Sequence, residues 1–183
     1  QANLVDIDNV EASARAVRHL IDLGHENIIH LSGPKYSKHS SERVAGIRRA
    51  FSRSPLIFDD EIVLQAGDSF EEGYRAALDH FSEDVPTTAV TCYNDLVALG
   101  TMKALRELGL TVPDDVSVVG FDDLNMLDYF PIPLTTVRVP KYEMGRKATD
   151  LLLKQIQGNG ADTCQRISLD ADLVVRSSTA PLE

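Results

Sequence analysis

Residues 88–123 read TAVTCYNDLVALGTMKALRELGLTVPDDVSVVGFDD, and the pattern of this stretch decides the fold class. Apolar runs at 88–92 and 116–121 predict two short buried strands. Between them, residues 95–108 carry apolar side chains at helical spacing, and Asn94 can cap that helix. A strand, a helix and a second strand, repeated at intervals of about 30 residues, are typical of the unit that builds parallel sheets.

The same unit recurs toward the N-terminus. Residues 27–32 and 61–66 predict two further strands, and residues 10–23, 40–52 and 70–83 predict the helices that flank them. Parallel strands that are covered on both faces are mostly apolar, and these runs share that property. The expected fold class is therefore α/β, a parallel sheet flanked by helices on both faces.

The pattern changes after residue 121. Three prolines between residues 131 and 140 interrupt an irregular stretch through which no helix can run. Residues 141–157 then predict an amphipathic helix, and residues 166–175 predict a β-rich tail. At the other end of the chain, residues 3–8 predict a strand that ends on a carboxylate.

Composition excludes several classes of function. The 183 residues include 18 Lys and Arg against 28 Asp and Glu, so the net charge is −10. Such a surface repels phosphate backbones, and we expect no nucleic-acid binding by this chain alone. No apolar run reaches the length of about 18 residues that a membrane helix needs, and we expect no membrane partner. Cys92 and Cys164 fit no zinc or redox spacing, which predicts reduced, buried thiols and a cytoplasmic location.

Polar groups follow four of the predicted strands, at the point where each strand ends. In an open parallel sheet, ligands bind beyond the carboxyl ends of the strands. The strand-end groups are Asp8-Asn9, Gly67-Asp68-Ser69, Asn94-Asp95 and Asp122-Asp123, and the loop at 35–43 adds Lys35, Lys38, His39 and Arg43. Carboxylates accept hydrogen bonds from sugar hydroxyls and an arginine donates to sugar oxygens, so the set suits a polyhydroxylated ligand.

Simpler structural roles remain open for these residues. Asn94 can be a helix cap without any ligand role, Asp122 and Asp123 can form a turn, and Arg43 can belong to a surface ion pair. The histidines are scattered and no cofactor motif is found, so we expect neither a metal nor a cofactor.

One motif suggests an enzyme. Gly67-Asp68-Ser69 resembles the GDS motif of ester hydrolases, whose Asp-x-x-His pair comes late in the chain. Here Asp22 and His25 have that spacing but precede the serine, and no such pair follows it. No Gly-x-Ser-x-Gly elbow and no Walker loop is found. We therefore expect no enzyme activity and keep an ester hydrolase as a distant alternative.

Six motifs in order make the chain resemble the lactose-repressor family of bacterial transcription regulators. The motifs are VDIDN at 5–9 with HLIDLGH at 19–25, RVAGI at 43–47, TAV at 88–90 with YND at 93–95, VPDDVSVVGFDD at 112–123, LTTV at 134–137 and LVVRSST at 173–179. The resemblance implies an effector domain of the type I periplasmic-binding-protein-like fold, with a ligand cleft between two subdomains. The ligand would be a sugar or a sugar phosphate.

The resemblance also implies how the chain is organised. Residues 9–134 would form the C-subdomain, and residues 1–8 and 135–165 would be remnants and crossovers of the N-subdomain. Residues 166–183 would be a C-terminal strand and tail that return to the C-subdomain. The DNA-binding head would be missing, so operator DNA would be reached only through that absent N-terminal domain.

The resemblance carries roles onto four of the strand-end residues. Asp8 would be a hinge carboxylate that faces the effector, and Arg43 would grip the effector. Asn94 would contact effector hydroxyls, and Asp122 would accept hydrogen bonds from them. Two neighbouring carboxylates would instead hold the strand-end turns: Asp95 and Asp123.

Other positions would set specificity. Lys38 and His39 fall where the family varies its ligand contacts. Ser69 and Phe70 occupy the place where the family often has an aromatic residue that stacks on the ligand, and the segment is one residue short there.

We further expect a homodimer, built from the helices at 70–83 and 95–108 and the segment 124–132. The apolar stripe of helix 141–157 would dock on a neighbouring chain or fold back over the cleft. The alternative of the same fold is a fragment of a periplasmic-type solute-binding protein.

Overall fold

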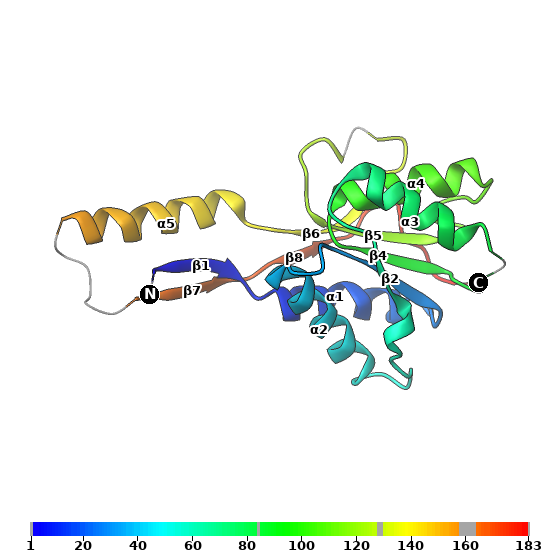
Figure 1. Ribbon diagram of the computed structural model, residues 1–183, viewed down its shortest axis with the longest axis horizontal. Helices are drawn as coiled ribbons and strands as arrows, with labels where there is room; N and C mark the ends of the chain where they lie inside the picture. The colour runs from blue at the N-terminus through cyan, green and yellow to red at the C-terminus, as the bar shows by residue number, and fades with distance from the viewer. Residues whose placement is uncertain (1, 84, 128–129, 158–163, 183) are drawn as a thin grey trace.

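The computed structural model describes residues 2–83, 85–127, 130–157 and 164–182. A six-stranded sheet with helices on both faces forms most of the molecule, and a smaller unit of β1, β7 and α5 projects from one end (Figure 1). The strands are β1 (Leu4–Ile7), β2 (Ile28–Ser32), β3 (Val63–Gln65), β4 (Ala89–Cys92), β5 (Ser117–Asp122), β6 (Thr135–Arg138), β7 (Arg166–Leu169) and β8 (Asp172–Val174). The helices are α1 (Asn9–Asp22), α2 (Lys38–Phe51), the 3-10 turn η1 (Asp60–Ile62), α3 (Phe70–Phe81), α4 (Asp95–Glu107) and α5 (Lys141–Ile156).

The six-stranded sheet has the order β3-β2-β4-β5-β6-β8. Every neighbouring pair is parallel except β6 and β8, which are antiparallel. All residues of β2 and β4 are buried, because these central strands are covered on both faces. The expected fold class is therefore confirmed.

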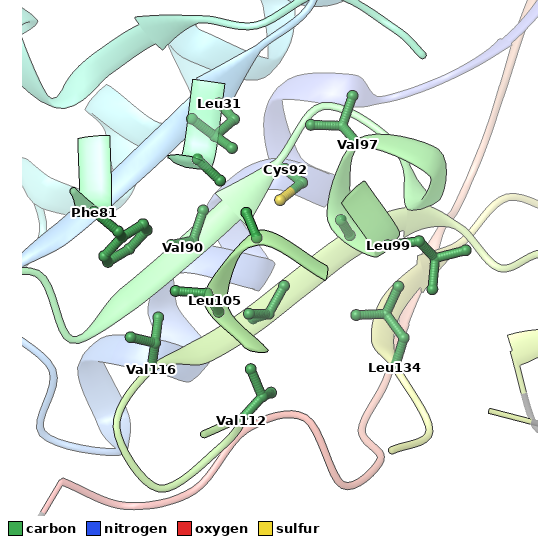
Figure 2. Close-up of a cluster of buried hydrophobic side chains, with 14 of the residues drawn as sticks. Leu31, Phe81, Val90, Cys92, Val97, Leu99, Leu105, Val112, Val116 and Leu134 are labelled. Atoms are coloured by element: carbon green, nitrogen blue, oxygen red, sulfur yellow. The ribbon is translucent and has the colours of Figure 1, made fainter. Parts of the chain in front are cut away.

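Successive side chains of the central strands point to opposite faces of the sheet. Val118 belongs to the core under α3 and α4, whereas Val119 belongs to the core under α1 and α2. Figure 2 shows the first core, in which Leu105 of α4 and Phe81 of α3 lie near Val90 of β4. Two separate apolar layers thus cover the two faces of the sheet.

Helices α3 and α4 approach each other closely. Gly100 of α4 lies directly against the backbone of α3, and a Cβ there would overlap with the carbonyl oxygen of Phe70. A glycine inside a helix weakens the helix by about 1 kcal/mol relative to alanine. The close contact with α3 explains why a glycine nevertheless stands at this position.

The smaller unit is covered only in part. Strands β1 and β7 form a two-stranded parallel sheet, and α5 lies beside it (Figure 1). Leu151 is the one buried residue among those of α5, while Leu152 and Ile156 are 57% and 72% exposed. The apolar stripe predicted for this helix therefore faces solvent over much of its length.

The segment after β8 packs into the larger unit. Ser178 is fully buried, and its backbone carbonyl accepts a hydrogen bond from the Val118 amide at 2.8 Å. Its hydroxyl donates to the Val118 carbonyl and accepts from the Thr135 amide. The Leu182 amide donates to the carbonyl of Leu23 at the end of α1.

Strand pairing divides the chain differently from the boundaries expected at residues 134 and 166. Strand β6 pairs with β5 in the large sheet, and β7 pairs with β1 in the small one. The chain therefore crosses between the two units after β1, after β6 and after β7. These crossing points follow from which strands pair with each other, which the family resemblance alone does not specify.

Two smaller expectations are also corrected. Helix α2 begins at Lys38 and not at residue 40, because the Ser37 side chain accepts a hydrogen bond from the Ser40 amide and caps the helix. Cys92 is buried as expected, but Cys164 is exposed. Among the described residues, no helix has both the length and the apolar character needed to cross a bilayer.

Candidate functional site

A buried arginine lies at the carboxyl edge of the large sheet. Arg43 of α2 is only 7% exposed, and its guanidinium lies 3.6 Å from the ring centroid of Phe121 and 4.6 Å from that of Tyr93. It donates a hydrogen bond to the Tyr93 carbonyl, and its Nε donates to Asn9 Oδ1 at 3.4 Å. Aromatic faces and fixed acceptors thus replace the water that a buried arginine loses.

The carboxylate that faces this arginine belongs to Asp122, the last residue of β5. Its Oδ1 lies 3.9 Å from Arg43 Nη2, which is an ion-pair distance but too long for a direct hydrogen bond. Burial raises the pKa of Asp122, while the positive charges of Arg43 and Lys141 oppose that change. The backbone of Asp122 has φ of 113°, a conformation that side-chain-bearing residues rarely adopt. Strain of this kind occurs most often at functional sites.

Two neighbouring carboxylates hold the turns after β4 and β5, as expected for Asp95 and Asp123. Asp95 is fully buried and accepts hydrogen bonds from Thr136 Oγ1 at 2.6 Å and from the Leu124 amide at 2.8 Å. Asp123 accepts hydrogen bonds from the side chains of Arg138 and Arg176. These contacts fix the backbone from which Asp122 projects.

A charged cluster forms the rim of the site, between the two units of the fold. Lys38 Nζ lies 3.3 Å from Asp6 Oδ2 and 2.8 Å from Glu42 Oε1, and His39 Nε2 lies 3.8 Å from Asp6 Oδ2. The two carboxylates raise the pKa of Lys38. Because Asp6 lies on β1 and Lys38 on α2, this cluster joins the small unit to the large one.

Three of the predicted residues also serve as local caps. The Asp8 side chain accepts from the Glu11 amide and caps α1. Asn94 accepts from the Val97 amide and donates to the Asp68 carbonyl, so both ends of its amide are engaged. Ser69 caps α3 in a reciprocal arrangement with Glu72, and its hydroxyl donates to Glu72 Oε2 at 2.6 Å.

Phe70 does not lie with Arg43 and Asp122. Its side chain packs against the core under α3 and α4 and lines a pocket beside α4. The physical reason is its place in the first turn of α3, where an apolar side chain is drawn into the helix pair. The structure therefore brings together Arg43, Asp122, Lys38 and His39, and it places Phe70 elsewhere.

Sequence reasoning missed two residues of the site, Asp6 and Tyr93, and it named Asn9 at a strand end without giving it a role. Asp6 is the polar residue that alternates with Val5 and Ile7 in a strand, and this alternation is a signal that a side chain leaves the apolar face. Asn9 is buried in α1 and binds both Arg43 and Glu42. The sequence around Tyr93 carries no such signal, because its contacts with Arg43 depend on how α2 packs against the sheet.

A mostly parallel sheet, helices on both faces and a polar site at the carboxyl edge are typical of α/β ligand-binding domains. Residues 17–179 match the family described as "Periplasmic binding protein-like domain", and the chain belongs to that family.

Its relatives are transcriptional repressors of the lactose-repressor type. The chain is 35% identical to the HTH-type transcriptional repressor CytR of Escherichia coli strain K12 over 178 residues, 97% of this chain and 52% of CytR. It is 35% identical to the HTH-type transcriptional repressor PurR of Vibrio campbellii over 182 residues, 100% of this chain and 54% of PurR. The chain thus spans about half the length of the curated relatives it matches.

Solved structures of the same family superpose closely. One is described as a transcriptional regulator CelR-cellobiose complex, with a TM-score of 0.91 and 32% identity over 97% of this chain and 54% of that one. Another is a LacI family transcriptional regulator from Enterococcus faecium with bound ribose, with a TM-score of 0.90 and 28% identity over 99% of this chain and 66% of that one.

Proposed function

We propose that this chain is the effector-sensing part of a transcription regulator of the lactose-repressor family. Its effector is a small polyhydroxylated molecule, a sugar or a sugar phosphate. The observation that supports this most directly is the Arg43–Asp122 pair at the carboxyl edge of the sheet, in which a buried arginine lies 3.9 Å from a half-buried carboxylate whose backbone is strained.

The separation of this pair suits a hydroxyl ligand. A hydroxyl group has one donor and two acceptor positions. One sugar hydroxyl can therefore accept a hydrogen bond from the Arg43 guanidinium and donate one to the Asp122 carboxylate. The raised pKa of Asp122 is consistent with a carboxylate that lacks water and gains from such a donor.

The rim bears on the choice between a neutral sugar and a sugar phosphate. Lys38 is a cation at the junction of the two units, but Asp6 and Glu42 already neutralise it. A phosphate would have to displace these carboxylates, so the rim favours the neutral sugar.

Signalling would follow from the position of the rim. Asp6 moves with β1 of the small unit, and Lys38 moves with α2 of the large one. A ligand that binds one relative orientation of the units more tightly shifts the population toward it. The remainder of the regulator would pass that shift to operator DNA.

Binding can be tested by an NMR titration of the 183-residue chain with D-ribose, ribose 5-phosphate and cellobiose. We expect weak binding, because a cleft ligand is normally buried on most of its surface and the small unit offers only part of one wall. The amides of residues 43, 93 and 122 should shift. Arg43→Gln should remove these shifts, whereas Arg48→Gln, an exposed change on the same helix, should keep them. Equal shifts in both variants would contradict the proposal.

The regulator assignment has a separate test. The gene sequence upstream of Gln1 would encode a helix-turn-helix in a cytoplasmic regulator and a signal peptide in a periplasmic solute-binding protein. We propose no catalytic activity, because the Ser69 hydroxyl is engaged with Glu72 as a helix cap. Ester hydrolysis by the chain that is lost in Ser69→Ala would overturn this part.

We also propose a homodimer through α3, α4 and the segment at 124–132, of which residues 128–129 lie outside the described chain. An apolar pocket of about 350 Å³ lies there, between α4 and residues 130–132. Met102, which lines it, would be covered by the partner. Met102→Glu should lower the sedimentation coefficient, and Ile57→Glu, at an apolar residue that is 89% exposed elsewhere, should not. An unchanged coefficient in Met102→Glu would contradict this interface.

A further inference from the structure

A small cavity lies behind Arg43, between α1, α2 and the large sheet. Its volume is about 10 Å³, which is close to the space that a single water molecule needs. Most of its lining is apolar, but four of the lining residues carry polar side chains: Ser13, His30, Arg43 and Thr91. A water held in such a cavity requires two to four polar partners, so the lining meets this condition.

His30 of β2 contributes an unpaired nitrogen to this region. Its side chain is 3% exposed, and its Nε2 has no hydrogen-bond partner among the described residues. Leaving a buried polar atom without a partner is costly, and such atoms are rare in native proteins. The orphaned nitrogen therefore indicates a partner that the protein itself does not supply.

The hydrogen bonds on the other side of the ring define the tautomer. His30 Nδ1 lies 3.1 Å from the Thr91 carbonyl oxygen, which can only accept, so Nδ1 carries the proton. The Thr91 hydroxyl donates to the Ile29 carbonyl and is also an acceptor toward Nδ1. Burial lowers the pKa of His30 to about 4, which keeps the ring neutral near neutral pH. Nε2 is therefore a hydrogen-bond acceptor.

Arg43 provides the complementary donors. A guanidinium has five N–H donors, and Arg43 directs Nε to Asn9 and one Nη to the Tyr93 carbonyl. A water in the cavity can accept from Arg43, donate one proton to His30 Nε2 and offer the other to Ser13.

We infer that one ordered water in this cavity joins His30 Nε2 to the Arg43 guanidinium, and that His30 is a positioning residue for the arginine that binds the effector. The inference rests on the proposed function only where it concerns ligand affinity. The position and mobility of Arg43 can be measured without any ligand. His30 acts here from the sheet side, away from the ligand that Asp122 and Arg43 would share.

A matched pair of variants tests the inference. In His30→Gln the amide reaches the place of Nε2, whereas in His30→Asn it reaches only the place of Nδ1. Both variants remove the ring, so urea unfolding should show similar losses of stability. The specific readout is the ¹⁵N order parameter of the Arg43 Nε–H group, identified by its absence from the spectrum of Arg43→Lys. We expect His30→Asn to lower this order parameter and His30→Gln to keep it.

Ligand binding provides the second readout. With D-ribose as the probe, His30→Asn should weaken binding about fivefold, the effect of losing one neutral hydrogen bond, and His30→Gln should bind like the original chain. In a high-resolution crystal structure, one water should lie within hydrogen-bond distance of both His30 Nε2 and Arg43.

Without ligand, two outcomes would overturn the inference: equal order parameters in both variants, or a ring protonated at Nε2. If ribose shifts no resonance while the Arg43 order parameter still follows His30, the inference stands and ribose is excluded as the effector. If ribose binds all three chains equally, the proposed ligand site stands and the role of His30 is refuted.

Discussion

Replacing Asp95 with asparagine should stabilise the protein, and the gain should grow as the pH rises. Asp95 is fully buried, and its two oxygens accept hydrogen bonds from Thr136 and Leu124. Burial raises its pKa from the usual 3.8 to about 6, although both hydrogen bonds oppose this change. An asparagine can accept from the Leu124 amide and donate to the Thr136 hydroxyl, so it keeps the contacts and loses the charge.

The sign and size follow from the shift. The folded state holds the Asp95 proton more tightly than the unfolded state, so the contribution to stability is full below about pH 4 and is lost as the pH rises through 6. A shift of this size corresponds to about 3 kcal/mol. Asparagine does not ionise. The free energy of unfolding of Asp95→Asn relative to the original chain should therefore rise by about 3 kcal/mol between about pH 4 and about pH 7.

Urea unfolding across this pH range measures the difference. Asp115→Asn is a control of opposite sign, because the Asp115 carboxylate is exposed and its hydrogen bonds with Thr111 lower its pKa. Its stabilising contribution is present at neutral pH and is lost as the pH falls, so Asp115→Asn should be most harmful at neutral pH. A pH-independent difference for Asp95→Asn would refute the account of the buried carboxylate.

Three other predictions concern packing, strain and association. Gly100→Ala should lower the free energy of unfolding by about 1–3 kcal/mol, because the new Cβ collides with the α3 backbone, whereas Gly145→Ala, in open space on α5, should not lower it. Asp122→Gly should remove backbone strain of about 1–3 kcal/mol and at the same time abolish the ribose-induced NMR shifts; a less stable variant that still binds would contradict both roles. Leu152→Glu with Ile156→Glu should lower the sedimentation coefficient if α5 docks on another chain by a contact other than the α3–α4 interface, and an unchanged coefficient would exclude that contact.

The sequence predicted the large sheet well because its signals are local. The runs that become β2, β4 and β5 are mostly apolar, and helices cover both of their faces. Asn94 caps α4 as its position before an apolar helix indicates. These features depend on neighbours within a few residues and need no knowledge of the tertiary fold.

Pairings between distant segments could not be predicted in the same way. Strand β7 joins β1 although about 160 residues separate Leu4 from its partner Arg166, and no local pattern encodes such a register. Asp8 shows the same limit, since a carboxylate after a strand is equally suited to capping the next helix and to facing a ligand. Only the structure shows that the Asp8 carboxylate accepts a hydrogen bond from the Glu11 amide and so caps α1.

The buried Ser178 bears on how the protein is made. Strand β5 leaves the ribosome well before the segment that supplies its hydrogen bonds, because Ser178 follows Val118 by 60 residues. Until that segment emerges, Val118 and Thr135 lack partners that the finished core provides. Long-range contacts of this kind slow folding, because the chain loses the entropy of the closed loop before the contact can stabilise it. The large sheet can form its strands during synthesis, but the hydrogen bonds that Ser178 makes with β5 and β6 can form only after the segment around residue 178 has been released.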